Sequence, residues 1–169
     1  MFPTQHAILG AIFAFLLHLL YPPFSVLGLT LLFLASFLID VDHYLLYVIE
    51  RRDISLRKAY FWCRDLGLTY ESLTPKQLKT ARIPICFFHT FESTIILFIL
   101  SFFSEFLFFI FLGFIFHLLV DYTYALIIAI NSSKEVTYYH PFLLSYNLFG
   151  KTTKELKNLD EFRTKNRAR

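Results

Sequence analysis

Histidine and carboxylate side chains recur at helical spacing within two long stretches of this chain that contain no lysine or arginine. Three pairs lie three or four residues apart, the spacing that puts side chains on one face of a helix. The pairs are Asp40 and His43, His89 and Glu92, and His117 and Asp121. A buried carboxylate without a cationic partner holds its proton, and these stretches supply no such partner. Because histidine nitrogens and carboxylate oxygens are ligands of zinc, manganese and iron, the pattern predicts a bound divalent cation.

The candidates for this chemistry comprise metal ligands and catalytic groups. The predicted metal ligands are His6, Asp40, His43, His89, His117 and Asp121. This set exceeds the ligands of one tetrahedral zinc, so the prediction is one or two ions, with zinc or manganese favoured. Asp42 and Glu92 are the predicted general bases, although Glu92 could instead orient His89 or bind the metal itself.

Structural interpretations of the same residues stay open at this point. They are a polar helix end formed by Asp40, Asp42 and His43, and a hydrogen-bonded pair of His117 and Asp121 within one helix. His18 lies near the outer membrane interface with no carboxylate at the same depth, and it is predicted to be an interfacial histidine. His140 lies in the tail and is predicted to be a surface residue, with folding back over the site as the alternative.

The composition indicates that membrane-embedded helices position these residues. Of the 169 residues, 56% are hydrophobic and 17% are charged, and Phe alone contributes 22. So short a chain cannot bury that many aromatic side chains in one soluble core, and a disordered chain lacks them. Cys63 and Cys86 are too few for a disulfide framework and are predicted to be free thiols.

The positions of the cations predict the helices. All 16 Lys and Arg lie in residues 51–82 and 134–169, which separate and follow two cation-free blocks. Each block is long enough to cross a bilayer twice, since one crossing needs about 20 apolar residues. Breaks at Pro22-Pro23 and Ser104-Glu105 divide the blocks. The predicted helices are residues 4–21, 24–49, 83–103 and 105–130. The expected fold is all-α, an integral-membrane four-helix bundle in residues 1–133.

The positive-inside rule predicts the orientation of this bundle. With four crossings, the N-terminus, the basic loop 50–82 and the basic tail 134–169 share one side, which is therefore cytoplasmic. The prediction is a multi-pass plasma-membrane protein with both termini inside. The loop and tail are expected to form short amphipathic helices on anionic membrane lipids. A protein or nucleic-acid partner for them is the less favoured alternative, and no nucleic acid is expected.

The order of the polar motifs resembles that of the membrane-bound metal-dependent hydrolase family, the YdjM-like proteins. Their pattern runs from a Thr/Gly-His start through Leu-Pro-Asp-Ile-Asp-His and His-Arg-Gly-x-Thr-His-Ser to Gly-x-x-x-His-x-x-x-Asp. The counterparts here are Thr4-Gln5-His6, Leu38-Ile39-Asp40-Val41-Asp42-His43, His89-Thr90-Phe91-Glu92-Ser93, and Gly113 to His117 to Asp121. The third of these segments, which begins at His89, lacks the Arg-Gly and one histidine of the family motif. In the second segment, Ile39 replaces the proline of the family motif. The resemblance covers residues 1–141 and implies a metal site and a hydrolytic activity of unspecified substrate.

The leading hypothesis is a metal-dependent hydrolase facing the cytosol, which attacks a lipid or another membrane-associated ester, phosphoester or amide with activated water. A metal-ion or proton transporter is the competing class, but it needs a polar route through both leaflets. The outer halves of the predicted helices offer only His18, Glu105 and a few Ser and Thr. A third hypothesis is a non-catalytic scaffold in which a metal holds the helices together.

Overall fold

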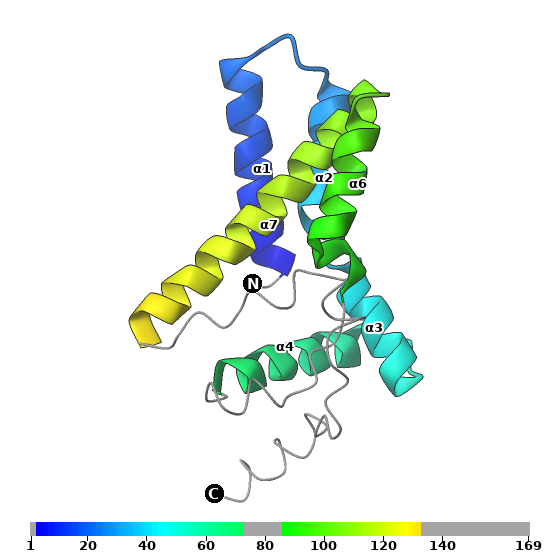
Figure 1. Cartoon of the computed structure of the whole chain (residues 1–169), viewed down its shortest axis with the longest axis vertical. Helices are drawn as coiled ribbons and strands as arrows, with labels where there is room; N and C mark the ends of the chain where they lie inside the picture. The colour runs from blue at the N-terminus through cyan, green and yellow to red at the C-terminus, as the bar shows by residue number, and fades with distance from the viewer. Residues whose placement is uncertain (1–2, 73–85, 133–169) are drawn as a thin grey trace, which may run out of the picture.

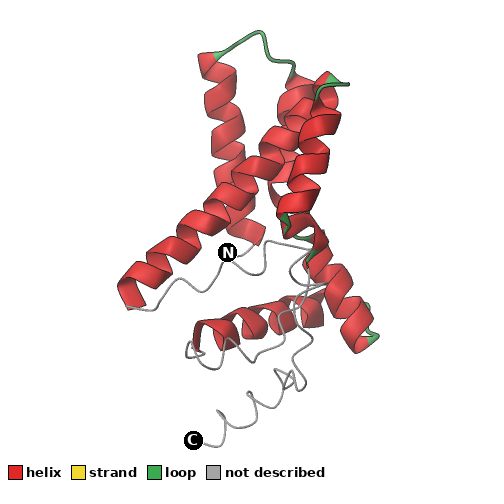
Figure 2. Cartoon of the chain, in the orientation of Figure 1, coloured by secondary structure: helices red, strands yellow, loops and turns green. Residues whose placement is uncertain are grey.

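The computed structural model describes residues 3–72 and 86–132, and the regular structure in these ranges is helical (Figure 1, Figure 2). The elements are α1 (Pro3–Leu20), α2 (Val26–Leu38), α3 (Val41–Arg51), α4 (Leu56–Ser72), the 3-10 turn η1 (Phe87–His89), α6 (Phe91–Ser101) and α7 (Glu105–Ser132). The segments long and apolar enough to cross a membrane are Pro3–Leu20, Val26–Arg51 and Glu105–Ile127. The predicted all-α class is confirmed for the described residues, and candidate membrane spans lie in both cation-free blocks.

Helix α2 packs against both α1 and α7 (Figure 1). Glycines make these contacts close. A Cβ atom on Gly113 of α7 would overlap the backbone carbonyl of Leu32 in α2, and one on Gly10 of α1 would overlap the Ser36 side chain. Small residues at a crossing let helix backbones approach, which is how helices associate in lipid. Because Gly113 lies about one turn before His117, this crossing also sets how near His117 comes to α2.

Many large apolar side chains are exposed and several polar side chains are buried, which is the reverse of the distribution in a soluble protein. Large apolar side chains such as Phe15, Ile96 and Leu119 are more than half exposed, at 61%, 55% and 58%. The buried polar residues include His6, Ser36, Asp42, His89, Thr90, Ser93 and His117. An apolar outside around a polar interior is the arrangement expected of helices that face lipid.

An apolar core fills the space near the loop that joins α1 to α2. Leu29, Leu32 and Phe109 are buried together, and Phe24 packs edge-on against Phe109 with ring centroids 5.2 Å apart. Phe13 of α1 also packs on this cluster. The α6–α7 turn lies at the same end of the molecule (Figure 1). The opposite end carries the buried histidines and carboxylates.

The predicted helix 24–49 is wrong in one respect, because the chain turns at Ile39 and Asp40 between α2 and α3. The Asp40 N–H bonds the Phe37 carbonyl at 3.3 Å, and the His43 N–H bonds the Asp40 carbonyl at 3.1 Å. These bonds span three residues, as in a 3-10 turn. The Asp40 side chain makes no capping bond to α3. Its carboxylate is therefore available to the groups that surround it.

The predicted helix 83–103 also differs from the structure, because α6 begins only at Phe91. Thr90 has an extended backbone (φ −97°, ψ 152°), and its side chain accepts the Ser93 N–H at 3.2 Å. This N-cap separates η1 from α6. With 11 residues, α6 is about 16 Å long, which is shorter than the hydrocarbon core of a bilayer. The structure thus shows three long candidate spans in its described part rather than four.

Helix α4 lies across the end of the molecule that carries the buried polar residues (Figure 1). Its Cys63 thiol donates a weak hydrogen bond to the His43 carbonyl of α3 at 3.8 Å. In the turn between α3 and α4, Asp53 accepts the Ser55 N–H at 2.9 Å and binds Lys58 at 2.8 Å. One helix therefore lies within the basic loop, as expected. The rest of that loop and the basic tail lie outside the described residues.

Candidate metal centre

Four potential ligand atoms gather around the contact between two histidine rings. They are Asp40 Oδ1, His89 Nε2, His117 Nε2 and Asp121 Oδ2, and we call them the four-ligand cage. The two histidine nitrogens are 3.0 Å apart, and Asp121 Oδ2 lies 3.3 Å from His117 Nε2 and 3.8 Å from His89 Nε2. Asp40 Oδ1 lies 3.5 Å from His89 Nε2 and 3.7 Å from His117 Nε2. The junction of α2 and α3, the end of η1 and the middle of α7 thus meet here.

The size of the cage fits a divalent first-row metal. A tetrahedral ion with ligand bonds of about 2.0–2.1 Å separates its ligand atoms by about 3.3 Å. Each of the two histidine nitrogens lies 3.0 to 3.8 Å from the other three atoms of the cage. The side chains are between 0% and 17% exposed, so water does not replace these contacts. Two imidazole nitrogens with two carboxylate oxygens match the ligand preferences of zinc and manganese.

Hydrogen bonds outside the cage determine which way its imidazoles face. His117 Nδ1 lies 2.8 Å from the Ser36 carbonyl, which only accepts, so Nδ1 donates. His89 Nδ1 likewise donates to Asp42 Oδ2 at 3.0 Å. In neutral rings both Nε2 atoms then hold lone pairs, which face each other 3.0 Å apart beside two carboxylates. Only a cation or added protons reconcile four acceptors at these distances.

Asp40 and Asp42 hold opposite nitrogens of one imidazole ring. Asp42 Oδ2 binds His89 Nδ1 at 3.0 Å, while Asp40 Oδ1 lies 3.5 Å from His89 Nε2. Residues two apart on an unbroken α-helix point in nearly opposite directions, so the turn at Ile39 and Asp40 makes this arrangement possible. Asp42 Oδ2 also accepts the Phe88 N–H at 3.0 Å, which ties η1 to α3. A carboxylate behind a ligating histidine orients the ring and raises its basicity.

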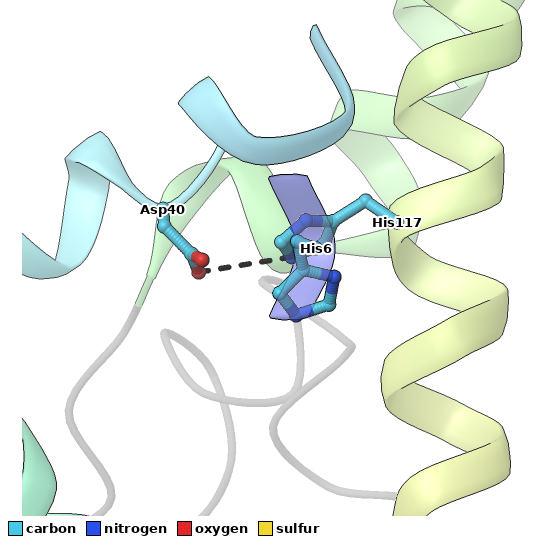
Figure 3. A group of neighbouring side chains, drawn as sticks. All are labelled: His6, Asp40 and His117. Atoms are coloured by element: carbon cyan, nitrogen blue, oxygen red, sulfur yellow. Dashed lines mark ion pairs between the residues drawn. The ribbon is translucent and has the colours of Figure 1, made fainter. Parts of the chain in front are cut away.

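His6 lies beside the cage and contacts two of its members. Its ring is fully buried and stacks on His117 with centroids 3.8 Å apart (Figure 3). His6 Nε2 lies 3.0 Å from Asp121 Oδ1, the oxygen that faces away from the other histidines. Among the described residues, His6 Nδ1 and Asp40 Oδ2 are buried without a hydrogen-bond partner. Unsatisfied polar atoms in so buried a place indicate that the site takes a further ligand.

His43 is the most exposed of the histidines that contact the buried carboxylates. Its Nδ1 lies 2.9 Å from Asp42 Oδ1 and 3.5 Å from Asp40 Oδ1. With 37% of its side chain exposed, His43 is far more open than the cage residues. The contact with Asp40 agrees with the predicted shared face of these two residues. His43 thus connects the buried carboxylates to the surroundings of the protein.

Glu92 does not share a helix face with His89, and that expectation is wrong. Thr90 starts α6 after His89, so the two residues belong to different elements. Glu92 is half-buried in the first turn of α6 and belongs to none of the clusters that could hold a metal ion. Its role as a base stays a prediction. His18 is exposed, as expected of an interfacial residue, and His140 lies outside the described residues.

Cys86 is a candidate ligand that sequence reasoning missed. It forms a group with Asp42 and His43 in which the ligand atoms all lie within 4.8 Å of one another. Burial raises the pKa of the Cys86 thiol, and it raises the pKa of the Cys63 thiol to about 11. Nearby carboxylates such as Asp42 raise both pKa values further. Without a metal, both thiols are therefore protonated near neutral pH. The available signal was the spacing of Cys86 and His89, three residues apart.

Comparisons of this chain with protein-family models, with curated proteins and with solved structures find no match. The description of the site therefore depends on its geometry. That geometry is a buried group of histidines and carboxylates that could hold a metal ion, set among helices long and apolar enough to cross a membrane.

Proposed function

We propose that this chain is a multi-pass membrane hydrolase whose four-ligand cage binds a divalent cation, with zinc or manganese as the best match. The observation that carries the proposal is the contact between two buried histidine nitrogens, each of which also lies within 3.8 Å of two carboxylate oxygens. The cation-free blocks of the sequence hold no Lys or Arg to neutralise that group. A bound cation supplies the missing charge and satisfies all four acceptors at once.

Two of the chain's hydrogen bonds prepare the cage, and one side chain is placed to relay protons. When bound, a divalent ion lowers the pKa of water toward 7 and polarises a carbonyl or phosphoryl group. The Ser36 carbonyl and Asp42 keep the Nε2 atoms of the two cage histidines turned inward. His43 donates from Nδ1 to Asp42 Oδ1 and is half-exposed, so its Nε2 is the nitrogen left to accept a proton and release it outside. Asp42 as the general base is the alternative.

Access from one side favours a hydrolase over a transporter. Between the cage and the α1–α2 loop, Leu29, Leu32 and Phe109 form the buried apolar core described above. A transporter requires a polar route to both faces of the membrane. The residues of this core offer no polar group to such a route, whereas at the opposite end His43 is 37% exposed. The arrangement supports a site that exchanges substrate with one side only.

Exposed apolar side chains beside the cage support a lipid or another membrane-associated ester, phosphoester or amide as the substrate. Phe87 and Phe88 of η1 are 50% and 38% exposed, directly before His89. Close to Asp40 and Asp42 in the sequence, Val41 and Leu45 of α3 are 42% and 49% exposed. An acyl chain could lie along these surfaces while its polar linkage reaches the cage.

The proposal includes the membrane topology and the family. We infer four crossings in a helix bundle, one of them made by the short helix α6 where the bilayer is locally thinned. Both termini and the site then lie on the cytoplasmic side of the plasma membrane, where the basic residues of the loop and tail follow the positive-inside rule. We also place the chain near the YdjM-like hydrolases. Four of the positions matched to their motifs form the cage, and a fifth, His6, lies beside it.

Metal analysis of detergent-purified protein tests the proposal. Wild type is expected to hold zinc or manganese and to hydrolyse p-nitrophenyl butyrate, bis(p-nitrophenyl) phosphate or micellar phosphatidylglycerol. His117→Ala and Asp121→Ala should lose the metal of the cage and this activity, while His18→Ala, an exposed histidine on α1, should keep both.

Three outcomes would overturn the proposal. Wild type that binds no divalent metal removes its basis. Cation flux into liposomes that depends on Asp121 indicates the transporter. Loss of the metal that melts the protein, with no turnover of any of these probes, indicates the scaffold.

A further inference from the structure

A second cluster of potential ligands lies next to the four-ligand cage and contains sulfur. It consists of Asp42, His43 and Cys86, which offer a carboxylate oxygen, an imidazole nitrogen and a thiol sulfur within 4.8 Å of one another. Asp42 is buried, while His43 and Cys86 are half-buried. The three come from two segments that are more than 40 residues apart in the sequence. Their convergence is therefore produced by the fold.

Backbone contacts hold this sulfur-containing cluster in place. Cys86 precedes η1 with an extended backbone (φ −97°, ψ 108°), and its carbonyl accepts the His89 N–H at 3.1 Å. The N–H of Phe88, the middle residue of η1, donates to Asp42 Oδ2 at 3.0 Å. The start of η1 is thus fixed against the start of α3, where Asp42 and His43 lie. A rigid supporting structure of this kind is what a metal site requires.

We propose that Asp42, His43 and Cys86 form a second divalent-cation site, selective for a thiolate-binding ion such as zinc. A thiolate, an imidazole and a carboxylate together are zinc ligands, and the half-exposed His43 leaves room for water in the fourth position. The four-ligand cage has only nitrogen and oxygen donors, so the two sites differ in their preference for soft ions. Binding displaces the thiol proton of Cys86 to solvent.

This assignment divides the candidate ligands between two ions. Asp40, His89, His117 and Asp121 belong to the cage, and His43 belongs to the sulfur-containing site, so His43 relays protons only when that second site holds no ion. Asp42 serves both, because its Oδ2 holds His89 while its Oδ1 faces His43. The second site does not depend on whether the chain is a hydrolase. A second site explains why the chain has more candidate ligands than one tetrahedral ion can use.

Cobalt substitution of the full-length, detergent-purified protein tests this site, because cobalt bound to a thiolate gives a near-ultraviolet charge-transfer band. Wild type is expected to bind two equivalents of Co²⁺ and to show the band. Cys86→Ser should lose the band and one of the two equivalents. Cys63→Ser, a thiol on α4 outside the proposed ligand set, should keep both. Asp121→Ala should lose the other equivalent and keep the band.

The outcomes separate the two proposals. A charge-transfer band that persists in Cys86→Ser, or one that disappears only in Cys63→Ser, overturns the second site. An Asp121→Ala variant that retains both equivalents overturns the cage and leaves the second site standing. Zinc protection of wild type supplies a measurement that needs no variant. Saturating Zn²⁺ is expected to slow alkylation of Cys86 by maleimide at least tenfold, read by mass spectrometry, and an unchanged rate refutes the site.

Discussion

Replacement of Asp42 by asparagine separates a positioning role from a base role for this carboxylate. Asp42 is 6% exposed, and its oxygens engage His89 Nδ1 at 3.0 Å, the Phe88 N–H at 3.0 Å and His43 Nδ1 at 2.9 Å. An asparagine side chain has the same shape, and its amide oxygen can still accept from the first two groups. What Asp42→Asn removes is the negative charge behind the His89 ring.

The size of the effect follows from that geometry. A carboxylate that accepts the second nitrogen of a ligating histidine is worth about 10- to 100-fold in metal affinity, or about 1.4–2.7 kcal/mol. Asp42→Asn should therefore weaken binding at the cage by this factor, with turnover recovered at saturating metal. A general base behaves differently, because its loss costs about 10²–10⁴-fold in turnover and leaves metal affinity unchanged.

The assay is a metal titration of detergent-purified protein by calorimetry, performed in a Cys86→Ser background so that only the cage is measured. Turnover of the hydrolysed probe is followed over the same metal range. The matched control is Asp53→Asn, a carboxylate that also accepts a backbone N–H but lies in the α3–α4 turn. Unchanged affinity in Asp42→Asn, together with turnover that no metal concentration restores, would refute the positioning argument and establish Asp42 as the base.

Three further predictions test the packing, the metal and the thiols. Gly113→Ala should destabilise the protein by about 1–3 kcal/mol, since a Cβ there would overlap the Leu32 carbonyl, whereas Gly67→Ala, with no atom within 4 Å of the added Cβ, should be neutral or stabilising in a thermal melt. In a Cys86→Ser background, EDTA should lower stability by about 2.7 kcal/mol relative to protein at a metal concentration 100-fold above Kd, and adding Asp121→Ala should abolish that difference. Burial raises the pKa of the Cys63 thiol to about 11, so its alkylation in metal-free protein should accelerate about tenfold per unit of pH between about pH 7 and 10, and a rate that levels off near pH 9 would contradict the burial.

Local signals in the sequence located the ends of the long helices well. The expected helix 4–21 is observed as Pro3–Leu20, because Pro22 and Pro23 cannot continue it. The helix expected at 105–130 is observed as Glu105–Ser132. The spacing of His117 and Asp121 also sufficed, since side chains four apart on a regular helix must meet, and their ligand atoms lie 3.3 Å apart.

Interruptions of helices were not predictable from local signals. Hydropathy runs without a break through Ile39, so nothing in the sequence alone distinguishes a turn there from a continuous helix. The turn is stabilised by contacts with a distant part of the chain, notably Asp42 with His89, 47 residues away. The position of Glu92 was not predictable from local signals either. Its spacing from His89 predicts a shared helix face, but Thr90 is the N-cap of a new helix between them. The positioning role of Asp42 and the cluster with Cys86 likewise depend on tertiary contacts.

The buried hydroxyl groups and the atoms of the cage differ in how their hydrogen-bonding capacity is satisfied inside the protein. Ser36, Thr94 and Ser101 donate to backbone carbonyls three or four residues earlier, at 2.7, 3.0 and 2.6 Å, so each is satisfied within its own helix. The cage atoms cannot do this, because two lone pairs and two carboxylate oxygens are all acceptors. Without a metal they must share protons instead. Metal binding at the cage therefore competes with protonation, and metal affinity should fall as pH falls.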